Sequence, residues 1–161
     1  MIDSADTLRR LYPQASPRSR AKQLDRLDDT MRRFVAHAPL CVIASAGAAG
    51  EGLDSSPRGG RPGFVQVADE RTLLILDVTG NNRLDTLENL LADPRIGLLF
   101  MIPGVDETLR VNGTARLRDE AAFTDLFAAE RQRPKLVIEV QVAEAYLQYL
   151  YTEEGQDIAG K

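Results

Sequence analysis

Residues 55–63 read SSPRGGRPG, and this short stretch, which directly follows Asp54, places two arginines, two prolines and three glycines between two apolar runs. A hairpin turn needs far fewer residues of these kinds. Glycine lets backbone N–H groups approach a flat ligand, and Ser and Arg side chains donate hydrogen bonds to anionic oxygens. Residues 54–63 are therefore a candidate binding segment centred on Arg58. The alternative is a solvated loop whose glycines serve only the turn.

A second candidate is GNNR, residues 80–83, directly before a predicted helix over 83–92. The first turn of a helix has unpaired N–H groups, and its dipole favours an anion there. Arg83 adds a cation at the same place, so the segment predicts a phosphate site. Simple capping of the helix by Asn82 is the alternative.

A third candidate is TLRVNGTAR, residues 108–116, in which apolar and polar residues alternate. This period predicts a strand whose polar face carries Arg110. A barrel strand with a hydrated exterior explains the same pattern. Gly113 inside the strand predicts a bulge or the close approach of another backbone.

The hydrophobic spacing along the chain predicts short strands joined by hairpin-like turns. The strands are expected over 40–46, 53–56, 64–67, 72–77, 95–102, 108–118 and 136–142. Helices are expected over 7–11, 21–38, 83–92, 121–129 and 143–151. This order favours a mainly β, α+β fold, in which an antiparallel barrel or curled sheet is flanked by helices. Residues 1–161 are expected to form one domain, with an N-terminal extension over 1–20 and a C-terminal helix or tail over 143–161.

Composition argues against several function classes. The net charge of -4 and the pI of about 5.1 argue against general nucleic-acid binding. The chain has one cysteine, Cys41, and one histidine, His37, so we expect no intrachain disulfide, no metal site and no Cys–His catalytic pair. Cys41 lies in an apolar run and is expected to be a buried, inert thiol. No secretory signal or membrane-spanning stretch is recognised, so we expect a cytoplasmic protein with no membrane partner.

The three segments, taken together and in order, resemble the flavin-binding split-barrel proteins of the pyridoxamine 5'-phosphate oxidase-like family. The resemblance rests on Asp54 with SSPRGGRPGFV, then LLILDVTGNNRLDTLENLLADPRIGLLFMIPG, then ETLRVNGTARL, and covers roughly residues 20–142. It implies a six-stranded antiparallel split barrel that forms a homodimer, with FMN in a groove between the two subunits. The C-terminal tail departs from the family pattern, and the chain has no Trp.

The resemblance also implies a set of cofactor-binding residues. Ser56, Pro57, Arg58 and Gly59 would line the flavin ring, and Phe64 and Val65 would follow on the strand beneath it. Asn82 and Arg83 would hold the phosphate at the helix start. Arg110 and the turn formed by Ile102 and Pro103 would come from neighbouring strands, of the same chain or of the second subunit.

The expected function is that of an FMN-dependent oxidoreductase, which passes a hydride or electrons between a small molecule and flavin. The sequence names no catalytic residue and no substrate. Three alternatives stay open: a flavin-binding carrier or sensor without turnover, a split barrel that holds a deazaflavin or haem, and a dimeric interaction module without a cofactor.

Overall fold

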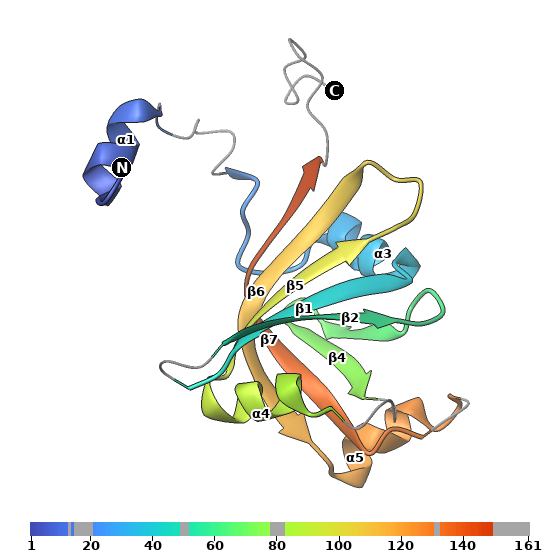
Figure 1. The fold of residues 1–161 in the computed structure, drawn as a ribbon. Coiled ribbons are helices and arrows are strands. Elements are labelled where there is room, and N and C mark those ends of the chain that lie inside the picture. Colours follow the sequence, from blue (N-terminus) through green and yellow to red (C-terminus); the bar gives the residue numbers. More distant parts are fainter. Residues whose placement is uncertain (13, 15–20, 49–51, 78–82, 131–132, 150–161) are drawn as a thin grey trace.

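A computed structural model describes residues 1–12, 14, 21–48, 52–77, 83–130 and 133–149 of the chain (Figure 1). The described strands form one antiparallel sheet of seven strands in the order β2-β1-β5-β6-β7-β4-β3. Their bounds are β1 Leu40–Ala46, β2 Leu53–Gly59, β3 Val65–Asp69, β4 Thr72–Asp77, β5 Arg95–Met101, β6 Glu107–Arg118 and β7 Leu136–Tyr149. β2 and β3 are the two edge strands and do not pair with each other. The curled sheet is therefore open between them. The expected mainly β fold with flanking helices is confirmed, with seven strands rather than the six that the family resemblance implies.

The last strand is longer than the sequence predicts. β7 runs to Tyr149, so the predicted helix over 143–151 is wrong for the described residues 143–149. Glu144–Tyr149 pair with residues 107–112 of β6, and this ladder overrides the helical propensity of the Ala, Glu, Leu and Gln residues there. β7 also pairs with β4 through residues 136–141, so it is a central strand.

The predicted helices over 21–38, 83–92 and 121–129 are shorter in the structure, whereas the first helix extends the predicted 7–11 to Ala5–Leu11. α1 spans Ala5–Leu11, α3 Asp29–His37, α4 Asp85–Ala92 and α5 Ala121–Thr124, and a 3₁₀ turn at Asp125–Phe127 continues α5. The predicted helix over 21–38 is wrong in its first half, because the Leu24 backbone pairs with Ala145 and the Leu27 N–H donates to the Glu70 carbonyl. Asp28 then begins α3 by accepting a 2.8 Å hydrogen bond from the Met31 N–H.

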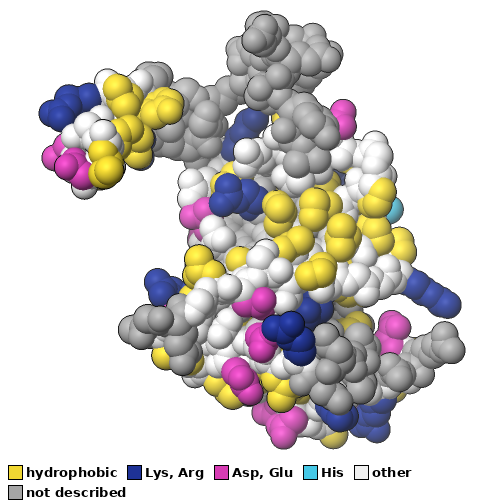
Figure 2. Space-filling model, viewed as in Figure 1, with side chains coloured by type: hydrophobic (Ala, Val, Ile, Leu, Met, Phe, Trp, Pro, Cys, Tyr) yellow, Lys and Arg dark blue, Asp and Glu magenta, His cyan; other side chains and the backbone are white. Residues whose placement is uncertain are grey.

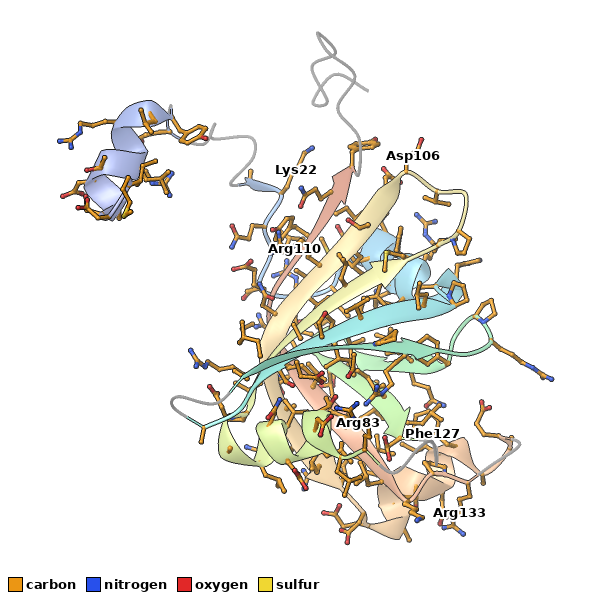
Figure 3. The ribbon with its side chains drawn as sticks, in the orientation of Figure 1. Lys22, Arg83, Asp106, Arg110, Phe127 and Arg133 are labelled. Carbon is orange, nitrogen blue, oxygen red and sulfur yellow. The ribbon has the colours of Figure 1, made fainter. Side chains whose placement is uncertain are left out.

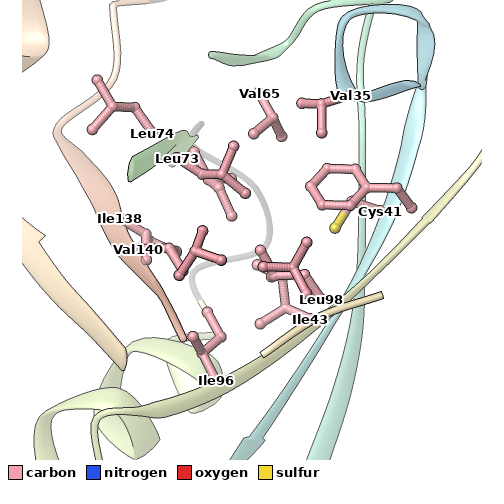
Figure 4. Close-up of a cluster of buried hydrophobic side chains, with 14 of the residues drawn as sticks. Val35, Cys41, Ile43, Val65, Leu73, Leu74, Ile96, Leu98, Ile138 and Val140 are labelled. Carbon is pink, nitrogen blue, oxygen red and sulfur yellow. The ribbon is translucent and has the colours of Figure 1, made fainter. Parts of the chain in front are cut away.

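The core lies inside the curled sheet and beneath α3 and α4. Cys41, Ile43, Leu73, Phe100 and Ile138 are fully buried there (Figure 4). Burial raises the pKa of the Cys41 thiol to about 12, because a thiolate is poorly solvated in an apolar interior. The predicted burial of Cys41 is confirmed, and the raised pKa makes the thiol unreactive at neutral pH.

Gly113 confirms the bulge that the sequence predicts. The register of β6 against β7 shifts between Asn112 and Gly113. A Cβ at Gly113 would lie 2.1 Å from the Gln141 carbonyl oxygen, so only glycine fits without movement of the backbone. The bulge marks the point beyond which β7 pairs with β6 and no longer with β4.

Among the described residues, no helix is long and apolar enough to cross a membrane.

Candidate functional site

β2 places three polar side chains on the inner side of the sheet. The strand extends to Gly59, so Pro57 and Arg58 belong to it and not to a loop. Because neighbours in a strand alternate between faces, Asp54, Ser56 and Arg58 share one face. They lie opposite Ser45, Ile43 and Cys41 of β1, which point inwards. Polar residues therefore line the interior at the open edge of the sheet.

Helix α4 supplies the next residue of this site. Thr86, in its first turn, is only 3% exposed. Its Oγ1 donates a 2.7 Å hydrogen bond to Asp54 Oδ2 and accepts a 3.4 Å hydrogen bond from Arg58 Nη2. Ser56 Oγ donates to the same Asp54 oxygen at 2.8 Å. One hydrogen-bonded group thus joins β2 to the start of α4, and we call Asp54, Ser56, Arg58 and Thr86 the β2–α4 cluster.

The hydrogen bonds of the cluster stabilise the charged form of the Asp54 carboxyl. Its pKa lies below the usual value, chiefly because Thr86 donates to the charged form, with further contributions from Ser56 and Arg58. Asp54 is therefore ionised at neutral pH. Asp77, at the end of β4, behaves differently: burial raises its pKa, and the charges of Arg58 and Lys135 oppose this effect.

Three cations lie around this end of the sheet. Arg58 comes from β2, Arg83 lies just before α4, and Lys135 lies just before β7. Arg83 is exposed and forms an ion pair with Asp85, in which Nη2 lies 2.8 Å from Oδ2. Exposed pairs of this kind contribute about 0–1 kcal/mol, so loss of the ion pair with Asp85 would by itself cost little.

The outer face of the sheet is hollowed and carries both apolar and polar side chains. One groove of about 440 Å³ crosses β2, β1, β5, β6 and β7, and its lining includes Val42, Ala44, Leu99 and Arg110. A second hollow of about 620 Å³ adjoins it and shares Ala44 and Gly97 with it. Figure 2 shows hydrophobic side chains gathered on this face, over the strands β1, β5 and β6. The Arg110 guanidinium lies over the Tyr146 ring, 5.2 Å from its centroid.

The residues predicted from the sequence fall into separate groups. Ser56 and Arg58 lie together in the β2–α4 cluster, with Arg83 at the start of the same helix. Pro57 is exposed and pairs with Val42, and Gly59 pairs with Leu40, so both face away from the cluster.

The other predicted residues lie elsewhere. Phe64 and Val65 are 8% and 2% exposed, with their side chains in the core. Ile102 and Pro103 follow β5 at the turn before β6. Figure 3 shows Arg110 on the upper part of the sheet and Arg83 below it, near α4. Asn82 lies outside the described residues.

Sequence reasoning included Asp54 in the candidate segment without a role for it, and it missed Thr86, Asp77 and Lys135. Asp54 had a usable signal, since it stands two positions before Ser56 and four before Arg58 and therefore shares their face of a strand. The other three reach the site only through tertiary packing.

A protein-family model described as "Pyridoxamine 5'-phosphate oxidase" matches residues 27–149. No curated protein matches the chain.

Several solved structures have a similar fold. HupZ of Group A Streptococcus is 16% identical, with a TM-score of 0.63, and the alignment covers 80% of this chain and 99% of that one. A Lactobacillus delbrueckii protein, provisionally named a pyridoxamine 5'-phosphate oxidase, is 20% identical, with a TM-score of 0.57 and coverage of 78% and 98%. An FMN-binding protein from Syntrophomonas wolfei is 8% identical, with a TM-score of 0.57 and coverage of 75% and 85%.

At these identities the structural matches establish the fold alone. The family model adds to them, because it spans β1 to β7 and thus both the β2–α4 cluster and the outer face. The chain therefore belongs to the pyridoxamine 5'-phosphate oxidase family.

Proposed function

We propose that the protein binds FMN and acts as an oxidoreductase on a small molecule. The observation that carries this proposal is that Arg58 contacts Thr86 in the first turn of α4 and Arg83 stands just before the same helix, in a chain of this family. The FMN phosphate carries nearly two negative charges at neutral pH, and guanidinium groups bind such an anion through paired, charge-assisted hydrogen bonds.

The residues of the site fit this group. Arg58 uses Nη1 for the Pro57 carbonyl at 3.2 Å and Nη2 for Thr86, and a guanidinium has further N–H donors. The dipole of α4 favours an anion at the same place. Asp54 and Asp77 reduce the local positive charge, so the attraction depends on close contact with Arg58 and Arg83.

A bound flavin would supply electron transfer between small molecules, and the chain would supply binding and orientation. Arg58 and Arg83 would bind the phosphate group. Their cationic N–H groups would exchange water for phosphate oxygens, and the buried Thr86 would keep Arg58 in place.

We further propose that two copies of the chain pair through the outer face. This face presents two hollows lined in part by apolar side chains, and a second copy would remove that apolar surface from water. In such a dimer, Arg110 of one copy would complete the cofactor site of the other, together with Ile102 and Pro103 at the β5–β6 turn. The separation of Arg110 from Arg83 within one chain supports this arrangement (Figure 3).

The test is the absorption spectrum of the purified protein, followed by titration with FMN. A two-band flavin spectrum, with FMN released on denaturation, would support the proposal. A colourless protein that fails to bind added FMN would contradict it. A haem or deazaflavin spectrum would mean that the protein binds that cofactor instead of FMN. Steady-state assays with a nicotinamide donor or oxygen then separate an oxidoreductase from a flavin carrier or sensor.

A further inference from the structure

One carboxylate oxygen of Asp54, Oδ2, accepts hydrogen bonds from two hydroxyl groups. Ser56 Oγ and Thr86 Oγ1 donate to Oδ2 at 2.8 and 2.7 Å. A hydroxyl has a single proton to donate, so both side chains commit their proton to Asp54. Their oxygens then face their other neighbours only as acceptors.

Thr86 uses this acceptor capacity to hold Arg58. Its Oγ1 accepts from Arg58 Nη2 at 3.4 Å, and α4 buries the threonine so that its hydroxyl cannot turn freely towards water. The Pro57 carbonyl holds Nη1 of the same guanidinium. Asp54 thus determines the direction of the Thr86 hydroxyl, and Thr86 in turn fixes Arg58.

We propose that Asp54 is the positioning residue of the anion site and that, through Thr86, it orients Arg58 for a phosphate group. This rests on the proposed function for the choice of FMN as the ligand. The charge of Asp54 acts in the opposite direction, because a carboxylate beside Arg58 weakens the attraction of the site for an anion. Two substitutions separate the two effects.

Asp54→Asn removes the charge and can keep both hydrogen bonds, because one amide oxygen in the place of Oδ2 can accept from both hydroxyls. Asp54→Ala removes the charge and the hydrogen bonds. In titrations followed by flavin fluorescence, we expect Asp54→Asn to bind FMN at least as tightly as the wild type. We expect Asp54→Ala to bind about tenfold more weakly than Asp54→Asn. Equal affinities of the two variants would overturn the proposal.

Thr86 provides a second, matched pair of variants. Thr86→Ser keeps the hydroxyl and should retain wild-type affinity. Thr86→Val has a similar shape but loses the hydroxyl and keeps the Asp54 charge, so it should bind FMN at least as weakly as Asp54→Ala. Because the two residues act in series, the double variant Asp54→Ala/Thr86→Val should be no weaker than Asp54→Ala alone. If the losses of FMN affinity in the two single variants add in the double variant, Asp54 and Thr86 act independently, which would contradict the proposal.

A measurement without flavin separates this inference from the proposed function. The Nη2–Hη NMR signal of Arg58, assigned by its loss in Arg58→Lys, should be slowly exchanging in the wild type and in Asp54→Asn, because Nη2 is the atom that donates to Thr86. It should exchange faster in Asp54→Ala and Thr86→Val. If the wild type binds no FMN, the proposed function fails, and this signal still decides whether Asp54 positions Arg58. An unchanged signal in both variants would refute the positioning role, and if Asp54→Ala does not fold, the Thr86 pair carries the test.

Discussion

Arg58 and Thr86 stand 28 positions apart in the chain, yet Nη2 of Arg58 donates a 3.4 Å hydrogen bond to Oγ1 of Thr86. This bond connects an edge strand to the first turn of α4. The first half of the candidate binding segment 54–63 is a strand. Its arginine, Arg58, is held by a residue of α4. The phosphate proposal depends on that contact and on Arg83, which stands just before α4.

The first prediction concerns Arg83. Replacing it with Ala should weaken FMN binding by about 1.5–3 kcal/mol, because a hydrogen bond to a charged group is lost. Isothermal titration calorimetry measures the change, with Arg33→Ala on the exposed face of α3 as the control. Unchanged affinity in Arg83→Ala would remove Arg83 from the site.

The second prediction concerns the outer face. Ala44 is exposed and lines both hollows, so Ala44→Glu places a charge where we propose the second copy packs. The variant should be a folded monomer with weakened FMN binding, as measured by multi-angle light scattering and titration. Ala36→Glu, at an exposed position of α3, should remain dimeric. A wild-type protein that is monomeric at micromolar concentration would contradict the shared site.

The third prediction tests the bulge. Gly113→Ala should lower the free energy of unfolding by at least about 2 kcal/mol, since its Cβ would overlap the Gln141 carbonyl. Gly52→Ala is the matched control, because no atom lies within 4 Å of its added Cβ. Urea denaturation compares the two. Equal stabilities would mean that the backbone can relax around position 113.

The fourth prediction follows from the raised pKa of Cys41, about 12 in the folded protein. An unfolded thiol ionises at about pH 8.5, so between that pH and about 12 the folded state binds more protons than the unfolded state. Stability should therefore fall as pH rises through this range. Cys41→Val should remove the part of the pH dependence that comes from the thiol, and a thiol reagent should label the wild type only after unfolding. Rapid labelling of the folded protein at neutral pH would contradict this assignment.

Much of the fold can be predicted because the alternation of apolar residues is a local signal. The strands near 40–46, 72–77 and 95–102 follow from it, and Gly113 is identified as a bulge from its place in a strand. The strand over 143–149 cannot be predicted in this way, because its Ala, Glu and Leu residues favour a helix and only pairing with β6 makes it a strand.

The sequence predicts those parts of the site in which arginines indicate the binding of an anion. Arg58 and Arg83 stand out in the sequence for this reason, and the structure places both at α4. Thr86 carries no such signal: its role depends on the packing of α4 against β1 and β2, which joins positions 32 residues apart. Nor does the sequence show that Arg110 lies on the outer face, away from Arg83.

The central place of β7 has a consequence for the order of events during synthesis. β4 is joined to β6 only through β7, and the pairing of β4 with β7 connects residues 72–77 with residues 136–141. The hairpin of β3 and β4 therefore cannot join the rest of the sheet until residues 136–141 have been synthesised. Contacts between such distant segments form slowly. We expect the curled sheet to be completed only when β7 joins β4 to β6, whereas β1, β2 and α4 can come together earlier.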